Sequence, residues 1–207
     1  MPEKIYISYV ILGITVLITF LAWNNRDVMN KSLYHPYTVK RENQWYRFIS
    51  HGFIHADQMH LIFNMFTFFF FAPFVEQYFE VKFGSGYYII PFYLLALVAA
   101  SIPTYMRHKD NSAYAALGAS GAVSAILFFS IAFMPWEKIY LFGIIGIPGI
   151  LFAVLYLWYS HRMDKQGTDN VGHNAHLWGA IFGFITPFIL DPSYVTRFIE
   201  LITHPKF

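Results

Sequence analysis

The chain has no cysteine and few charged residues: Asp, Glu, Lys and Arg make up only 13% of its 207 positions. Without cysteine it can form neither disulfides nor thiolate nucleophiles nor zinc–thiolate sites. A soluble domain usually carries about 25% charged residues, so a soluble enzyme and a disordered chain are both poor descriptions. The formal net charge of +2 at pH 7 is too small to indicate nucleic acid as a partner.

Apolar residues make up 57% of the chain, and its mean hydropathy is +0.43. A helix needs about 20 mostly apolar residues to cross a membrane, and the sequence contains six such segments. Inside hydrocarbon the backbone must satisfy its own hydrogen bonds, which favours helices over strands. We therefore expect an all-α integral membrane protein with six transmembrane helices in one domain covering residues 1–207. The expected spans are 7–23, 59–79, 86–106, 115–134, 139–159 and 175–190.

The connections between these spans differ in length. Three are longer (24–58, 107–114 and 160–174) and two are short (80–85 and 135–138). If the chain crosses the membrane alternately, the three longer connections share one face. The second, fourth and sixth spans then all begin on that face, at similar depth. The Lys and Arg distribution does not decide which face is cytoplasmic, because much of the excess falls in the first connection.

Polar side chains at membrane depth are costly and often functional, and the second span begins with a group of them. His60 and Asn64 are four residues apart and share a helix face, while Asp57 suits the N-cap. His51 and His55 precede that cap, and we favour a loop-anchoring role for them. A metal site is less favoured, because the four side chains do not converge in any simple helix.

The fourth and sixth spans also begin with polar groups among small residues. Ser120 lies in the Gly-Ala-Ser-Gly stretch 118–121, and His176 precedes Gly179 and Gly183. Taken alone, Ser120 fits a small-residue packing face, with its hydroxyl bonded to its own helix. His176 alone fits an isolated interhelical hydrogen bond, because glycines four residues apart let two helices approach closely.

Together these residues have the parts of an acyl-transfer site. Serine is a weak nucleophile unless a base lies beside it, and we expect Ser120 as nucleophile with His176 as general base. His60, Asn64 and the Ser120 N–H are the expected donors to the oxyanion. No carboxylate lies in the fourth or sixth span, which favours a dyad over a triad. Asp169, in the adjoining loop, is a less favoured orienting group.

With these motifs in order, the sequence resembles the rhomboid family of intramembrane serine proteases, over about residues 44–183. The family motif G-x-S-G matches 118–121, and A-H-x-x-G-x-x-x-G matches 175–183. A string of three histidines and an asparagine matches His51, His55, His60 and Asn64. The resemblance implies a six-helix bundle with a water-filled cavity open to the extracytoplasmic side. It also implies Ser120 as nucleophile, His176 as base, and His60 and Asn64 at the oxyanion hole.

Three further positions compare with the family less closely. Where the family has a Trp-Arg pair in the first loop, this chain has Tyr46-Arg47. Glu76 and residues 84–86 resemble the end of the family's second span, and we interpret these residues as structural. Many members carry an aromatic residue, four positions after the nucleophile, that stacks on the catalytic histidine. This chain has Ser124 there, so either another side chain stacks on His176 or the ring is held less firmly.

The resemblance implies an endopeptidase that needs no cofactor and cuts single-span membrane proteins near the outer membrane boundary. Its expected partners are those substrates and the lipid bilayer. A bacterial plasma membrane is the expected location, from the small size and the lack of appended domains. Three alternatives remain: a non-catalytic membrane-protein chaperone or retrotranslocation module, a small-solute transporter, and a histidine-metal membrane enzyme.

Overall fold

The structure is a computed structural model that describes residues 6–141, 144–166 and 172–205. Within these ranges it is predominantly helical, with one two-stranded antiparallel hairpin. The longer helices are α1 (Ile7–Asn24), α5 (Gln58–Phe83), α6 (Ile89–His108), α7 (Ser120–Phe133), α8 (Gly149–Gln166), α9 (His173–Leu190) and α10 (Tyr194–Thr203). The shorter elements are α2 (Arg26–Ser32), α3 (Pro36–Glu42), α4 (Arg47–Ser50), η1 (His51–Phe53), η2 (Gly86–Tyr88), β1 (Lys138–Leu141) and β2 (Ile145–Pro148).

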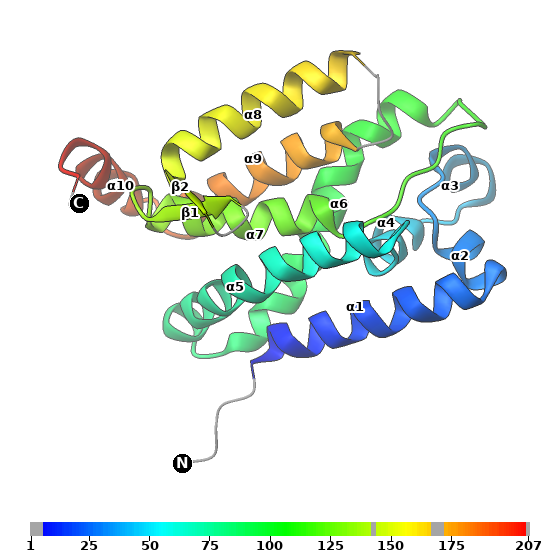
Figure 1. Cartoon of the computed structure of the whole chain (residues 1–207), viewed down its shortest axis with the longest axis horizontal. Helices are drawn as coiled ribbons and strands as arrows, with labels where there is room; N and C mark the ends of the chain where they lie inside the picture. Colours follow the sequence, from blue (N-terminus) through cyan, green and yellow to red (C-terminus); the bar gives the residue numbers. More distant parts are fainter. Residues whose placement is uncertain (1–5, 142–143, 167–171, 206–207) are drawn as a thin grey trace.

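Helix α7 lies at the centre of the molecule. Every residue from Gly121 to Ala132 is buried, as expected for a helix that is apolar on all sides. Helices α5, α6, α8 and α9 all contact it, and α1 and α8 lie at opposite edges (Figure 1). Helices α5, α7 and α9 begin at the same end of the molecule, beside α2–α4 (Figure 1).

Two glycines allow α9 to lie directly against α7. A β-carbon at Gly179 would overlap the carbonyl oxygen of Gly121, and one at Gly183 would overlap that of Ala125. Backbone therefore touches backbone over one helical turn, the close approach that small residues four positions apart permit. This contact fixes how the first turns of the two helices lie relative to each other.

The beginning of α5 is as expected from sequence. Asp57 is its N-cap and accepts a 2.8 Å hydrogen bond from the His60 N–H. Further along the helix, the buried Glu76 carboxylate accepts the N–H groups of Ile7 and Ser8 at 2.9 and 2.8 Å. These are the free donors at the start of α1, which favour a negative charge. Glu76 therefore joins α5 to α1, and its role here is structural.

The connection between α1 and α5 is folded against the bundle. Arg47 is buried, and its guanidinium donates to the carbonyls of Asn30 and Leu33 and to the side chain of Gln44. A buried cation is tolerated when its donors are satisfied in this way. Arg47, in α4, thus holds the end of α2 and the residues that follow α3.

Two expected helix boundaries are wrong. The span expected at 139–159 is preceded by a hairpin in which Lys138 pairs with Pro148, so α8 begins only at Gly149 and continues to Gln166. The span expected at 115–134 begins at Ser120, because Ala116 exchanges two 2.9 Å backbone hydrogen bonds with Tyr34. In both cases an apolar segment satisfies part of its backbone by pairing with another extended segment rather than within a helix.

Among the described residues, three helices are long and apolar enough to cross a membrane: Ile7–Asn24, Gln58–Phe83 and Gly86–His108. Helix α7 is apolar but has only 14 residues.

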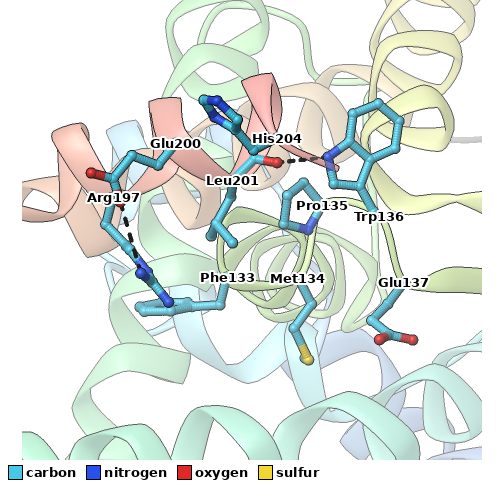
Figure 2. A pocket seen from close by; sticks show the side chains of 9 residues that line it. All are labelled: Phe133, Met134, Pro135, Trp136, Glu137, Arg197, Glu200, Leu201 and His204. Atoms are coloured by element: carbon cyan, nitrogen blue, oxygen red, sulfur yellow. Dashed lines mark hydrogen bonds and ion pairs between the residues drawn. The ribbon is translucent and has the colours of Figure 1, made fainter. Parts of the chain in front are cut away.

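The end of α7 away from Ser120 meets α10. Trp136 donates its indole N–H to the Leu201 carbonyl at 2.8 Å, and a groove of about 580 Å³ lies between the two segments (Figure 2). Arg197, Glu200 and His204 line its polar side. This groove lies a helix length from Ser120 and is separate from the candidate active site.

The glycine contact makes a prediction about stability. Gly179→Ala and Gly183→Ala each place a methyl group inside the backbone of α7, so each should lower the free energy of unfolding by about 1–3 kcal/mol or more. Thermal unfolding in detergent, followed by circular dichroism, measures the effect. Gly13→Ala in α1 is the matched control, because the new carbon would meet no atom within 4 Å apart from its chain neighbours and the backbone of its own helix. Equal melting temperatures for all three variants would contradict the close contact.

Candidate active site

The residues before Ser120 form an extended segment held by the first connection. After the Tyr34–Ala116 pair, the N–H of Gly118 donates to the carbonyl of His51 at 2.9 Å. The φ angle of Gly118 is +118°, a backbone conformation that residues with a side chain rarely adopt. The chain turns there and enters α7 at Ser120. Ala119, the N-cap, provides no side-chain hydrogen bond to the first turn of that helix.

His60 lies directly against this turn. A β-carbon at Gly118 would be 2.6 Å from Cε1 and 2.8 Å from Nε2 of the His60 ring. Gly118 is therefore required for its conformation and also for the space that His60 occupies. The structure brings the first turn of α5 into contact with the residues that lead into Ser120.

His55 lies beside His60, with the two rings edge to face and their centroids 5.0 Å apart. Its Nε2 accepts the Ala119 N–H at 3.4 Å, and its Nδ1 lies 3.1 Å from the Thr19 hydroxyl, which also donates to the Phe53 carbonyl. This chain of bonds requires a neutral ring with the proton on Nδ1. His55 thus holds the segment before Ser120, which agrees with the expected anchoring role.

His51 anchors the same segment. Besides its carbonyl bond to Gly118, its Nε2 shares a 3.1 Å hydrogen bond with the Ser101 hydroxyl. Burial lowers the pKa of His51 from 6.5 to about 4. Burial, with a smaller contribution from His60, lowers the pKa of His55 to about 3. Both rings are therefore neutral at physiological pH and act as hydrogen-bonding groups.

His176 lies in the first turn of α9, and its N–H donates to the Gly172 carbonyl at 3.1 Å. The preceding residue, Ala175, contacts α7 beside Ser120: its carbonyl oxygen is 3.4 Å from where a β-carbon of Gly121 would lie. The neighbours of Ser120 and His176 along the chain are thus in contact. The two expected catalytic residues begin adjacent helices at the same end of the bundle (Figure 1).

Two aromatic rings contact the His176 ring. Tyr156 from α8 lies nearly parallel to it, with centroids 6.3 Å apart and an interplanar angle of 24°. His173 meets it edge to face at 5.9 Å. Tyr156 also shares a 2.7 Å hydrogen bond with Ser124. Sequence reasoning missed Tyr156; the only signal was the absence of an aromatic residue at position 124.

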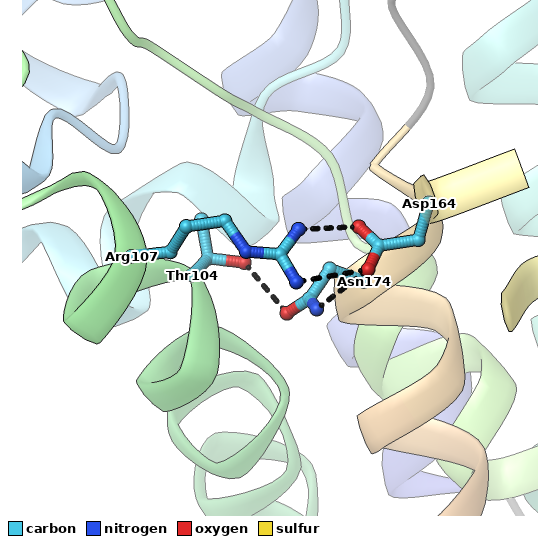
Figure 3. A network of polar contacts seen from close by, with 4 residues as sticks. All are labelled: Thr104, Arg107, Asp164 and Asn174. Carbon is cyan, nitrogen blue, oxygen red and sulfur yellow. Dashed lines mark hydrogen bonds and ion pairs between the residues drawn. The ribbon is translucent and has the colours of Figure 1, made fainter. Parts of the chain in front are cut away.

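A polar network holds the start of α9 two residues before His176. Arg107 and Asp164 form a bidentate ion pair at 2.7 and 3.0 Å (Figure 3). The Asn174 amide donates to Asp164 at 3.3 Å, and its oxygen accepts the Thr104 hydroxyl at 3.2 Å. Paired N–H···O bonds of this kind add geometric definition as well as energy. The network links the ends of α6 and α8 to the beginning of α9.

Asn64 is buried one turn after His60, and its amide donates to the His60 carbonyl at 2.8 Å. An amide nitrogen carries two N–H groups, so a second donor remains for another acceptor. Asp169 lies outside the described residues. Within the described ranges, no three His, Asp or Glu side chains lie close enough together to hold a metal ion.

Comparison with known proteins identifies the family. The Rhomboid domain model matches residues 42–193. The chain belongs to the rhomboid family, as its motifs indicated.

Individual relatives agree with this membership. RHOMBOID-like protein 12, mitochondrial, of Arabidopsis thaliana is 28% identical over 188 residues, covering 86% of this chain and 56% of the relative. The rhomboid protease GlpG of Haemophilus influenzae is 27% identical over 159 residues, covering 76% of each. Rhomboid-like protein 11, chloroplastic, of A. thaliana is 27% identical and covers 80% of this chain. The chain thus spans little more than half the length of the two plant relatives, 56% and 58%. Among these relatives, the H. influenzae protein is the one named as a protease.

Because His51 and His55 are buried as neutral rings, we predict that the stability of the folded protein depends on pH. Because folding lowers their pKa, the stabilisation is complete above the unfolded value near 6.5 and is lost as the pH falls towards about 4. The melting temperature should therefore fall between pH 7 and 4. His51→Gln, which cannot be protonated, should flatten this dependence, whereas His204→Gln, on the exposed end of the chain, should not. An equal slope in all three proteins would contradict the assignment.

Proposed function

We propose that this chain is an intramembrane serine endopeptidase in which Ser120 is the nucleophile and His176 the general base. The observation that supports this most directly is the backbone contact of α7 with α9 at Gly121, Ala175 and Gly179. It places the first turns carrying Ser120 and His176 side by side, in a chain whose family includes proteins named as rhomboid proteases.

In the proposed reaction, the Ser120 hydroxyl oxygen attacks a substrate peptide carbonyl while its proton passes to the His176 imidazole. The tetrahedral intermediate collapses, and the imidazolium delivers that proton to the departing amine. Water then hydrolyses the acyl-enzyme by the same two steps. The oxyanion is stabilised by the Ser120 N–H at the uncapped start of α7, where the helix dipole favours negative charge. His60 and Asn64 are the proposed side-chain donors.

We further propose that α1, α5, α6, α7, α8 and α9 form a six-helix transmembrane bundle. Helix α8 carries exposed apolar side chains suited to lipid: Leu151, Val154, Leu155 and Trp158. With 14 residues, α7 is about 21 Å long, shorter than the roughly 30 Å hydrocarbon core. A helix of this length leaves Ser120 below the membrane surface, so the folded first connection must admit water to it.

The proposed substrates are membrane proteins with a single helix, cut near the outer membrane boundary. A helical peptide bond is shielded by its own hydrogen bonds, so residues that weaken the helix near the bond should favour cleavage. The chain is an integral membrane protein. The names of its relatives include plant mitochondrial and chloroplast proteins as well as a bacterial protein. We propose a bacterial plasma membrane as the location on the basis of the sequence.

Substituting the two proposed catalytic residues tests the function. Ser120→Ala and His176→Ala should each abolish cleavage of a single-span reporter in proteoliposomes, since each removes a reacting group. Ser130→Ala is the matched control, because this buried serine lies in the same helix and its hydroxyl donates to the Ile126 carbonyl one turn earlier. Wild type and Ser130→Ala, but not Ser120→Ala, should be labelled covalently by a fluorophosphonate. A folded wild type that neither cleaves nor labels would instead indicate a non-catalytic chaperone.

The oxyanion donors give a graded prediction. His60→Ala or Asn64→Ala should lower kcat by about 10²–10³, the effect of losing one such donor. Turnover of the same reporter, with melting temperature as the folding check, measures this. Thr67→Ala is the control, because its hydroxyl bonds to Phe63 within α5. Unchanged turnover in both variants would remove these residues from the mechanism.

A further inference from the structure

The proposed base sits where its side chain needs support from another element. His176 is in the first turn of α9 and half-buried, and its ring has two rotatable bonds. A general base contributes only when it is held within reach of the proton that it takes. Packing from a neighbouring helix is one way to hold such a ring.

Tyr156 is placed to supply that packing and is itself fixed. Its ring lies nearly parallel to the His176 ring and packs against Phe128 and Phe152, with centroids 5.4 and 5.6 Å away. Its hydroxyl is 2.7 Å from the hydroxyl of Ser124. Ring pairs with centroids between about 4.5 and 7 Å contribute beyond simple burial.

Ser124 lies in an otherwise apolar stretch of α7, and the residue is only 5% exposed. A buried hydroxyl without a partner is costly, so Ser124 and Tyr156 satisfy each other. Ser124 is also four residues after Ser120, on the same face of α7 and about 6 Å along it. One hydrogen bond therefore ties the helix that carries Ser120 to the ring that contacts His176.

We propose that Tyr156, tethered by Ser124, is the positioning residue that holds the His176 ring in its working orientation. This inference rests on the proposed Ser120–His176 dyad. The aromatic support comes from α8, and position 124 serves as the anchor of that support. A purely structural alternative is that Tyr156 only packs α8 against α7.

Kinetics of four variants in proteoliposomes separate these roles. Tyr156→Leu removes the ring, Tyr156→Phe keeps the ring but breaks the tether, and Ser124→Ala breaks the tether from α7. Trp158→Leu is the control, since Trp158 lies on the same helix and is 59% exposed. The readouts are kcat and KM for the single-span reporter, the rate of fluorophosphonate labelling, and the melting temperature.

For a positioning role, Tyr156→Leu should lower kcat and the labelling rate together by about 10–100-fold, with KM changed less than about threefold. Tyr156→Phe should recover most of that loss, and Trp158→Leu should match wild type. Tyr156→Phe and Ser124→Ala remove the same hydrogen bond, so the double variant should have about the same kcat as either single variant. If Tyr156→Leu does not fold, these two tether variants carry the test, with kcat lowered severalfold in each.

Two results would overturn the proposal while leaving the dyad intact. One is an unchanged kcat and labelling rate in Tyr156→Leu, beside an inactive Ser120→Ala. The other is an effect on KM alone, which would assign Tyr156 to substrate access. If Ser120→Ala itself still cleaves the reporter, the proposed function fails and the positioning role fails with it.

Discussion

The direct contact between the backbones of α7 and α9 is the interaction on which the rest of the site depends. Gly179 and Gly183 remove the side chains that would otherwise separate the helices, so the carbonyls of Gly121 and Ala125 lie where β-carbons would be. Between apolar helices in a membrane, the hydrophobic effect gives little driving force, and close packing has to provide the attraction. The same contact that stabilises the pair sets the relative height of Ser120 and His176.

A second layer of support comes from buried polar groups in the first connection. His51 and His55 are satisfied by backbone and hydroxyl groups, and Arg47 by backbone carbonyls and the Gln44 side chain. Two of them act on the residues just before Ser120, because the His51 carbonyl accepts from Gly118 and the His55 ring accepts from Ala119. Neutral histidines suit this role, because an imidazole can accept at one nitrogen and donate at the other without the cost of burying a charge. The segment that leads into Ser120 is thus held by residues from a loop far away in the sequence.

Helix α8 is attached differently from the other helices. Its apolar side chains mostly face outward. Its described side-chain links to other helices include the Ser124–Tyr156 bond near its middle and the Arg107–Asp164 ion pair at its C-terminal end, beside the start of α9. The first link reaches the ring that contacts His176, and the second reaches Asn174 in the same turn of α9. Both of these connections therefore bear on the position of one imidazole.

The sequence by itself determined the apolar helical character, the family, and the cap of α5 at Asp57, because these depend on local composition and short motifs. It also indicated that Ser120, His176, His60 and Asn64 lie at the beginnings of helices at one end of the molecule. The positions of the apolar segments give the lengths of the connections between them, and alternating crossings then put the longer connections on one face. It could not place the hairpin before α8 or the extended residues 115–119. Apolar segments satisfy their backbone either within a helix or across a pair of strands, and only their tertiary partners decide which. Likewise, the sequence showed only that position 124 lacks the aromatic residue found in many family members. The fold brings Tyr156 from another helix beside it, and a contact between residues far apart in the chain produces no pattern in the sequence.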